Sequence, residues 1–289
     1  MIDLHLHTTA SDGRLAPDAL VARAAAAGLT VVSITDHDTT AGLPLAFEAA
    51  RRCGIRLIAG IEITAVERGR DVHVLGYFFN PGSQTLAGFL AAQRADRVRR
   101  VAAIGSRLRE LGYEIDITPL LDGARRQPAR TIGRPQVADA LVAAGHVADR
   151  TDAFDRLLGE GRPAYVARAG APVVEVTSVI GAAGGIASLA HPGLLGMDAD
   201  IPRLAREGLD ALEVRHSDHD SSAESTYRQI AVTLGLAVSG GSDFHGDDPT
   251  HGGRLGDVTL EQADFEALEK RWRKGKGERE KGEGKREKG

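Results

Sequence analysis

Short runs rich in Val, Ile and Leu recur along the chain, and stretches with helical periodicity separate most of them. Strands of a buried parallel sheet have this composition, and the helices that connect them have this periodicity. Helices are expected over 16–28 and 43–54, each ending at a glycine. Seven strands are predicted, at residues 1–7, 30–38, 55–64, 71–78, 184–192, 208–216 and 236–246. This alternation is typical of an α/β barrel or a wound sheet, and the fourth strand is also compatible with antiparallel pairing.

The first run, MIDLHLH, alternates apolar and polar side chains. In a strand, its aliphatic residues share one face, and Asp3, His5 and His7 share the other. Neighbours on one face of a strand lie about 7 Å apart, so the two imidazoles could converge on one ion. The alternative is a half-exposed strand whose histidines have no joint role.

The interval between the fourth and fifth strands, residues 79–170, is far longer than a usual connection between a strand and the next element. Its segment 86–112 has apolar residues at mostly helical spacing, and 133–145 and 151–159 predict two further helices. We therefore expect a helical insertion over the mouth of a discontinuous barrel made of residues 1–78 and 171–272.

Composition restricts the possible partners and location. The chain of 289 residues carries a formal net charge of −4. It therefore lacks the excess of basic residues that is typical of a protein that binds duplex DNA. No apolar run is long enough to span a bilayer, no signal-peptide pattern precedes the first strand, and the single cysteine, Cys53, cannot form an internal disulfide. We expect a cytoplasmic protein without a membrane partner, and nothing in the sequence implies an obligate protein partner.

The last stretch, residues 273–289, reads RKGKGEREKGEGKREKG and contains no apolar side chain to bury. Such a segment gains too little from folding to offset its ordering entropy, so we expect a disordered charged tail.

Side chains that can bind metals cluster at the strand ends. In α/β barrels these ends meet at a common face, where sites are built. Imidazole and carboxylate groups suit zinc, manganese and iron. Asp36 and Asp38 could instead hydrogen-bond a turn or a ligating histidine. Glu213, His216 and His219 could support a ligand from behind or cap a helix. The candidate residues at the strand ends are His5, His7, Asp12, Asp36, His37, Glu62, His73, His191, Glu213, His216, Asp243 and His245.

The combined motifs resemble the PHP family, the polymerase-and-histidinol-phosphatase superfamily of metal-dependent phosphoesterases. They are HxH (5–7), Asp12, TDHD (35–38), GIE (60–62), His73, AHP (190–192) and GSDFH (241–245). The resemblance implies a distorted (β/α)7 barrel with three divalent ions; manganese is expected, and zinc, iron and magnesium are the alternatives. It assigns one ion to His5, His7, Glu62 and Asp243, a second to Asp12, His37 and His245, and a third to Glu62, His73 and His191.

The predicted insertion contains the motifs RADRVRR (94–100) and GRP (133–135). With them, the chain resembles the bacterial PHP branch that hydrolyses nucleoside 3′,5′-bisphosphates and trims the 5′ ends of short RNAs. The resemblance implies that Arg97, Arg100 and Arg134 hold the phosphate that is not cleaved. Gln136 departs from the branch, which usually has histidine there, so the details of substrate contact are open.

We therefore expect a metal-dependent phosphomonoesterase that removes the 3′-phosphate of a nucleoside 3′,5′-bisphosphate through metal-activated hydroxide. Its catalytic residues would be His37, Asp243 and His245, and Asp12 would join the arginines in binding substrate. A 5′→3′ exoribonuclease on short 5′-phosphorylated oligonucleotides is the alternative enzyme. A metal-binding regulatory module without catalysis is the alternative outside enzymes.

Overall fold

The computed structural model describes residues 1–247 and 254–286 of the chain. Seven strands form one sheet whose spatial order follows the sequence from first to last. They are β1 (Ile2–Leu6), β2 (Val31–Ile34), β3 (Arg56–Glu67), β4 (Arg70–Tyr77), β5 (Ile186–Leu189), β6 (Ala211–Arg215) and β7 (Ala237–Gly240). All seven coincide with the predicted apolar runs.

The sheet curls into a nearly closed barrel. β1, β2 and β3 run parallel to one another, and so do β5, β6 and β7, whereas β4 is antiparallel to both of its neighbours. The two edges meet through Leu6 and Phe244, and the His7 amide donates to the Phe244 carbonyl over 3.0 Å. The predicted α/β barrel is thus confirmed. It departs from a regular parallel barrel at β4, which is antiparallel to its neighbours.

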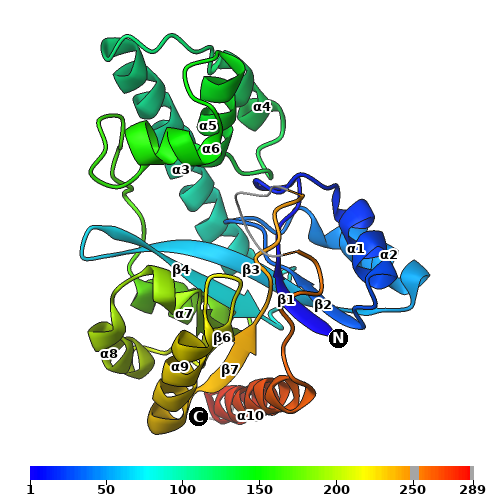
Figure 1. The fold of residues 1–289 in the computed structure, drawn as a ribbon. Helices are drawn as coiled ribbons and strands as arrows, with labels where there is room; N and C mark the ends of the chain where they lie inside the picture. The colour runs from blue at the N-terminus through cyan, green and yellow to red at the C-terminus, as the bar shows by residue number, and fades with distance from the viewer. Residues whose placement is uncertain (248–253, 287–289) are drawn as a thin grey trace.

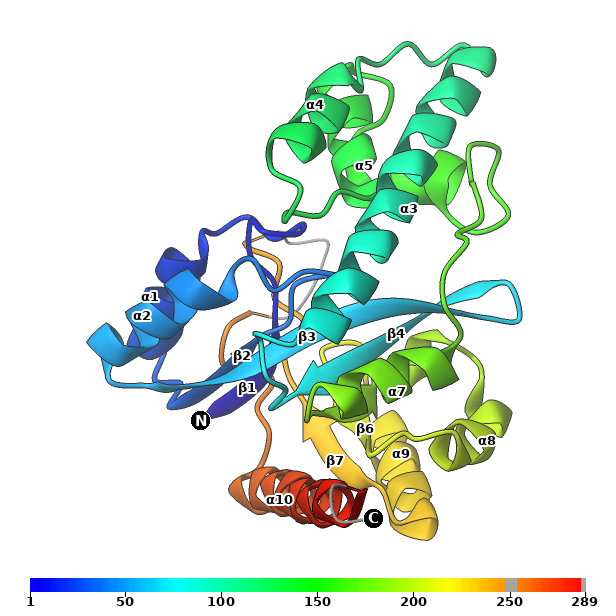
Figure 2. The ribbon, with the colours of Figure 1, turned by 180° about the vertical axis from the view of Figure 1, so that it is seen from behind.

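Helices cover the outside of the sheet (Figures 1 and 2). α1 and α2 pack together beside β1 and β2, α7 packs on β3, β4 and β5, and α10 packs against β7. Two 3₁₀ turns, η2 (Pro192–Leu194) and η3 (Asp198–Asp200), follow β5. The helices around the barrel are α1 (Pro17–Ala26), α2 (Leu43–Cys53), α7 (Val173–Ala182), α8 (Ile201–Arg206), α9 (Ser221–Leu234) and α10 (Gln262–Arg286).

Within residues 79–170, the start of α3 (Gln84–Glu110) packs on the barrel, where Leu86 and Leu90 join its core, and the rest forms the upper part of the molecule in Figure 1. The elements of this stretch are α3, α4 (Thr118–Arg126), α5 (Arg134–Ala143), α6 (Arg150–Ala153) and the π-helical turn η1 (Phe154–Leu158). They enclose a hydrophobic cluster of their own, which includes Val101, Ile104, Leu108, Leu141 and Leu158. This second cluster supports the predicted division into barrel and insertion, which remains a prediction.

Two glycines close helices where the sequence expects it. Gly54 ends α2 in the left-handed conformation (φ 71°), which glycine adopts at little cost, and Gly28 (φ 84°) follows α1. Both turns aim the chain directly into the next strand. Within the described ranges, no helix is both long and apolar enough to cross a membrane.

The C-terminal helix α10 extends through residues 273–286, and residues 287–289 lie outside the described ranges. Its first turns pack on the barrel, where Phe265 and Leu268 are buried. The disordered charged tail expected over residues 273–289 stays a prediction.

Candidate active site

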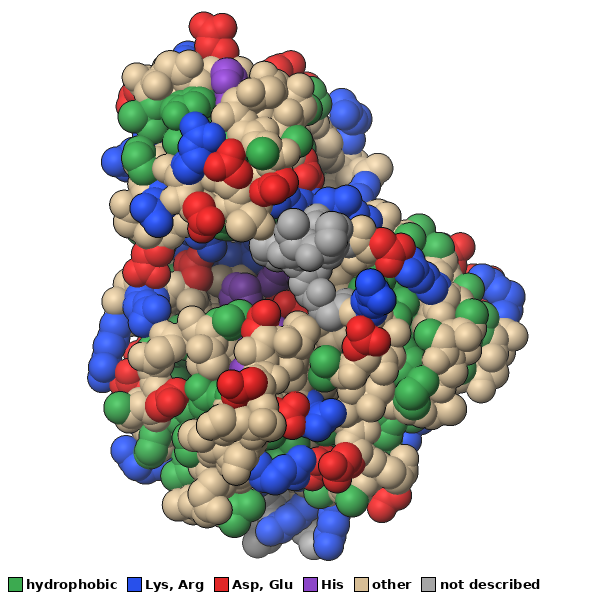
Figure 3. Space-filling view, viewed as in Figure 1, with side chains coloured by type: hydrophobic (Ala, Val, Ile, Leu, Met, Phe, Trp, Pro, Cys, Tyr) green, Lys and Arg blue, Asp and Glu red, His purple; other side chains and the backbone are tan. Residues whose placement is uncertain are grey.

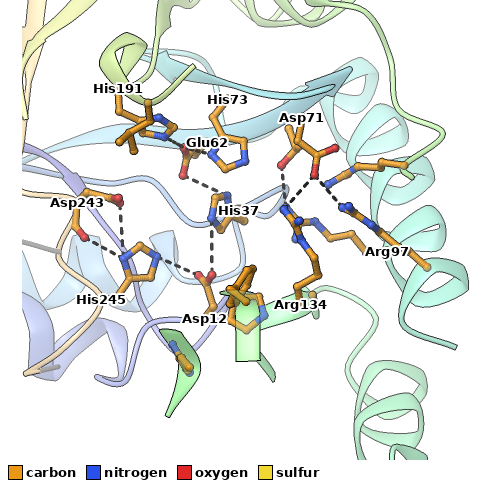
Figure 4. Close-up of a pocket in the computed structure, with 18 of the residues that line it drawn as sticks. Asp12, His37, Glu62, Asp71, His73, Arg97, Arg134, His191, Asp243 and His245 are labelled. Atoms are coloured by element: carbon orange, nitrogen blue, oxygen red, sulfur yellow. Dashed lines mark hydrogen bonds and ion pairs between the residues drawn. The ribbon is translucent and has the colours of Figure 1, made fainter. Parts of the chain in front are cut away.

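The strand ends bring the candidate ligands to one face of the barrel. Because β4 runs in the opposite direction to its neighbours, it must reach that face with its first residues, and His73 accordingly pairs with Thr64 near the end of β3. Figure 4 shows His73, Glu62, His37 and Asp12 lining the same hollow. The side chains form four-membered and three-membered groups whose ligand atoms lie within 4.8 Å of one another.

The first group contains His5, His7, Glu62 and Asp243. The Nε2 atoms of His5 and His7 lie 3.3 and 3.2 Å from Glu62 Oε2. They also lie 3.2 and 3.0 Å from Asp243 Oδ1. Both imidazoles of the first strand thus converge on the same two carboxylates, as the alternation of MIDLHLH predicts.

The second group contains Asp12, His37 and His245, and His7 joins it from the first group. Asp12 lies between the two other side chains (Figure 4). Its carboxylate oxygens are 3.7 Å from His37 Nε2 and 3.5 Å from His245 Nε2. The geometry is that of three ligand atoms around a shared point rather than of a hydrogen-bonded chain.

The third group contains His37, Glu62 and His73, and His191, which belongs to none of the groups, contacts the same carboxylate. Glu62 Oε1 lies 2.8 Å from His73 Nδ1 and 3.2 Å from His191 Nε2. His37 Nδ1 contacts the opposite oxygen, Oε2, at 3.1 Å. Glu62 therefore contacts members of every predicted ligand set, which is the placement that a bridging carboxylate requires.

These residues fit a cluster of divalent cations. Buried polar atoms normally find hydrogen-bond partners, yet several here have none in the described part of the chain. Nitrogen and carboxylate oxygen in this combination suit manganese, zinc or iron. The buried atoms without a hydrogen bond include His5 Nε2, His7 Nδ1 and Nε2, Asp12 Oδ1, His37 Nδ1, His73 Nδ1, His191 Nδ1 and Asp243 Oδ1.

The pKa shifts in the site also indicate a place for cations. Burial raises the pKa of Glu62, but the charges of His37 and His73 outweigh it and hold this pKa well below the usual range. Burial also opposes the charged form of His7, yet the neighbouring carboxylates of Asp243 and Glu62 raise its pKa to about 10. In the metal-free protein a proton on His7 therefore compensates carboxylates that a cation would otherwise compensate.

Glu213 orients two of the candidate ligands. It is fully buried in β6; its Oε1 lies 2.9 Å from His5 Nδ1, and its Oε2 accepts a 2.7 Å hydrogen bond from the His191 amide. A carboxylate on one imidazole nitrogen fixes the ring and leaves the other nitrogen for a metal. Support of a ligating histidine is one of the roles that the sequence left open for Glu213. His216 Nε2 lies 3.6 Å from Asp243 Oδ2.

Asp36 shapes the loop that carries Asp12. Its carboxylate accepts hydrogen bonds from the Thr8 amide, the Thr8 hydroxyl and the Ser11 hydroxyl, at 2.6–2.7 Å. Asp36 therefore stabilises a turn, which is one of the roles that the sequence left open. It is not part of the metal-type cluster, the name used below for His5, His7, Asp12, His37, Glu62, His73, His191, Asp243 and His245.

Arginines form the opposite wall of the hollow. The cavity has a volume of about 260 Å³ and opens between the barrel and residues 79–170, where Figure 3 shows histidine and basic side chains together. It is lined by the expected Arg97, Arg100 and Arg134 and by seven of the candidate ligands, Asp12, His37, Glu62, His73, His191, Asp243 and His245. Arg168 also lines it, although its sequence context gave no sign of this role.

Each pair of arginines shares one carboxylate from the barrel. Asp38 Oδ2 accepts from Arg97 Nε at 2.5 Å and from Arg168 Nη2 at 2.8 Å. Asp71 Oδ2 accepts from Arg100 Nη1 at 2.9 Å and from Arg134 Nη2 at 3.2 Å, and Figure 4 shows Arg134 turned toward it. The sequence did not reveal Asp71 and Arg168, because their partners lie 29 to 130 residues away.

One donor of Arg100 has no partner among the described residues. Its side chain is 7% exposed, Nε donates to the Val166 carbonyl, and Nη1 donates to Asp71. Its Nη2 is buried and, among the residues described, has no hydrogen-bond partner. A buried guanidinium donor without a partner is costly, so an anion in the cavity would satisfy it.

Two other features of the predicted insertion are structural. Arg99 pairs with Asp96 on the exposed side of α3 and does not line the cavity. Gln136, which departs from the resembling branch, caps α5: its Oε1 accepts from the Gly133 amide at 2.7 Å, and its Nε2 donates to the Ser11 carbonyl at 2.9 Å. It thereby links α5 to the loop that carries Asp12.

The chain is similar to known proteins along most of its length. Residues 3–132 match the family model of the PHP domain. A 5′-3′ exoribonuclease of Haemophilus influenzae is 36% identical over 84% of this chain and 89% of its own length. A 3′,5′-nucleoside bisphosphate phosphatase of Chromobacterium violaceum is 35% identical over 88% of this chain and 89% of its own.

A solved structure shows the same similarity at the level of the fold. A candidate metal-dependent phosphoesterase from Bifidobacterium adolescentis superposes with a TM-score of 0.85 at 34% identity, covering 93% of this chain and 96% of that one. The similarity therefore extends over the barrel, the metal-type cluster and residues 79–170 together. The chain belongs to the PHP family of metal-dependent phosphoesterases.

Proposed function

We propose that the chain is a phosphomonoesterase that hydrolyses the 3′-phosphate of nucleoside 3′,5′-bisphosphates. The observation that carries the proposal is that one cavity is lined on one side by most of the metal-type cluster and on the other by Arg100 and Arg134. A substrate with two phosphates can place one at each side. The Chromobacterium violaceum relative, which carries that substrate in its name, supports the choice.

The ligand groups divide among three ions in the proposal, with manganese as the expected metal. Bound there, the ions would activate water for attack on phosphorus and neutralise charge on the phosphoryl oxygens. The chain's own contribution is to hold the ligand atoms in place, and Glu213 does so for His5. The proposed ligands are His5, His7, Asp12, His37, Glu62, His73, His191, Asp243 and His245.

The arginine wall would bind and orient the second phosphate. Four guanidinium groups and the two carboxylates of Asp38 and Asp71 leave two positive charges in excess there. A phosphate monoester near neutral pH carries between one and two negative charges, so it neutralises most of this excess. Binding a remote phosphate in a fixed place also orients the reacting one, and this lowers the barrier of the chemical step.

The size of the cavity favours a small substrate. Ligand pockets commonly measure about 300–1,000 Å³, and the volume here, about 260 Å³, lies just below that range. A mononucleotide matches this size better than a folded RNA. Base recognition would be weak, because Val101, Ile104 and Phe154 give the adjoining wall an apolar character.

A 5′→3′ exoribonuclease acting on short RNA is the second candidate. The Haemophilus influenzae relative has that name, and one structural observation favours it. A second hollow, lined in part by Thr9, Arg130 and Gln136, shares Asp12 and Arg150 with the main cavity. It offers room for a nucleotide that continues from the 3′ side of the one being cleaved.

The reaction products distinguish the two candidates. Adenosine 3′,5′-bisphosphate, AMP and a 5′-phosphorylated dinucleotide are compared in Mn²⁺, with a chelated sample as control; inorganic phosphate is measured for the first two and released mononucleotides for the dinucleotide. Under the proposal the bisphosphate has the highest kcat/KM and yields AMP. A preference for the dinucleotide would favour the exoribonuclease, and no metal-dependent hydrolysis of any of the three would refute both.

A further inference from the structure

Building on the proposed function, we infer that Asp71 is a positioning residue that sets the arginine clamp at a fixed spacing from the metal ligands. The arginine clamp denotes Arg100 and Arg134. The substrate class follows from this geometry: a phosphate monoester whose second phosphate is separated by a spacer of sugar size.

The clamp is assembled from distant parts of the chain. Arg100 comes from α3 and Arg134 from the first residue of α5, yet both donate to the same oxygen, Asp71 Oδ2. Each guanidinium has one further support. Arg100 Nε donates to the Val166 carbonyl over 2.7 Å, and Arg134 lies 5.5 and 5.7 Å from the ring centres of Phe154 and Tyr165.

Asp71 is what allows the two cations to stay close. Burial, followed by the charge of Arg100, lowers the pKa of Arg134 to about 10, so the site opposes two adjacent charges. Asp71 Oδ2 lies between the two guanidinium groups, 2.9 Å from Arg100 Nη1 and 3.2 Å from Arg134 Nη2. One carboxylate between two guanidinium groups offsets their repulsion and leaves one positive charge for a ligand.

Strand β4 sets the distance from the clamp to the metal ligands. Asp71 and His73 are two residues apart, line the same cavity, and are separated by Val72, which is fully buried on the opposite face. Same-face neighbours on a strand lie about 7 Å apart. The pairing of Val66 with Asp71 and of Thr64 with His73 locks this register, and His73 reaches Glu62 at 2.8 Å.

A separation set by a strand cannot adapt to other substrates. Two phosphates joined directly by an anhydride bond are too close to occupy both positions, and a single phosphate leaves the clamp empty. We therefore expect adenosine 3′,5′-bisphosphate to be hydrolysed with a lower KM than ADP, AMP or p-nitrophenyl phosphate.

The test is the Asp71→Asn variant, which removes the charge and keeps the size. A hydrogen bond to a charged group contributes about 1.5–3 kcal/mol, so KM for the bisphosphate is expected to rise about 10- to 100-fold. Activity on p-nitrophenyl phosphate, which does not reach the clamp, is expected to stay within about twofold and also verifies folding. Asp71→Glu, which keeps the charge, is expected to lose less than Asp71→Asn.

Two controls separate positioning from a general structural effect. Asp122→Asn removes a comparable but exposed pair with Arg125 on α4 and is expected to change no constant. In an Arg100→Ala, Arg134→Ala background, Asp71→Asn is expected to cause no additional rise in KM, because a residue that acts through the clamp has no effect without it.

Each opposite result overturns the inference. An unchanged KM for the bisphosphate in Asp71→Asn would do so, as would an equal loss on p-nitrophenyl phosphate or a full additional loss in the clamp-free background. If the wild-type protein shows no preference for the bisphosphate, the proposed function itself fails, and this is seen before any variant is made.

Discussion

Glu62 is the residue through which the whole metal-type cluster connects. It is 1% exposed, its Oε2 contacts His5, His7 and His37, and its Oε1 contacts two further histidines. Contact of one carboxylate with so many imidazoles requires the cluster to be assembled around it. Loss of its charge should therefore be felt by every proposed ion.

Glu62→Gln is expected to reduce activity by at least about 100-fold and to lower the bound metal per protein. An amide of the same size is a poorer cation ligand, because it has no charge and only one acceptor atom. Metal content by mass spectrometry and phosphate release measure the two effects. Glu48→Gln, which removes a surface pair with Arg52, is the control. Full metal content in Glu62→Gln would contradict the bridging role.

Asp3 gives a prediction about stability and pH. It is fully buried, accepts hydrogen bonds from the Ser242 amide and hydroxyl, and lies outside the metal-type groups. Burial raises its pKa from 3.8 to about 6, although the Ser242 hydrogen bonds oppose the rise. The folded protein thus holds a proton that the unfolded chain releases between about pH 4 and 6, so Asp3 makes the free energy of unfolding fall as pH rises through that window.

Asp3→Asn should remove this dependence. Relative to the wild type, the variant is expected to gain stability from pH 4 to pH 6, by up to roughly 3 kcal/mol at about 1.4 kcal/mol per pKa unit. Urea unfolding of both metal-free proteins at several pH values measures the difference. A constant difference across the window would show that Asp3 is ionised in the folded protein throughout.

At the level of elements, the closure of the barrel depends on a glycine after β7. A Cβ atom at Gly241 would lie 2.3 Å from the His5 amide nitrogen and 2.7 Å from Asp3 Oδ1. The loop after β7 can therefore pass β1 only because residue 241 has no side chain. This close approach places Asp243 beside the two histidines of β1.

Gly241→Ala is expected to lower the free energy of unfolding by about 1–3 kcal/mol or more, since the contact is with backbone that cannot move aside cheaply. Gly181→Ala is the matched control, because nothing lies within 4 Å of a Cβ there. Being in helix α7, that control should be neutral or gain up to about 1 kcal/mol. Equal effects of the two substitutions would argue against the close approach.

The strands and the ligand positions could be predicted from the sequence because they depend on local periodicity. Apolar runs mark the strands, and His5, His7 and Asp243 lie on or just after them. The roles of Asp71 and Arg168 could not be predicted, since an acid and an arginine acquire them only from partners brought close by the fold.

At the level of the whole molecule, metal binding and folding are coupled. The ligand atoms come from segments between residue 5 and residue 245, and only the folded chain brings them together. Ions that bind this arrangement and not the unfolded chain stabilise the protein. Removal of metal should consequently weaken the fold and not only the activity.

Mn²⁺ at about 100 times its dissociation constant is expected to raise Tm by about 5–10 °C over a chelated sample, because such binding contributes about 2.7 kcal/mol. Differential scanning fluorimetry measures the shift. Glu62→Gln should show a smaller shift under the same conditions. A Tm that does not respond to Mn²⁺ or to chelation would contradict the proposed ligand set.

The two walls of the cavity come from different stretches of the chain. The metal-type cluster lies on the strand ends of the barrel, whereas Arg100 and Arg134 lie within residues 79–170. Natural selection can therefore alter what the enzyme recognises by changing the second stretch while the chemistry of the first is inherited intact. Asp71 limits such change, because a different recognition segment would still have to meet the carboxylate that the barrel presents.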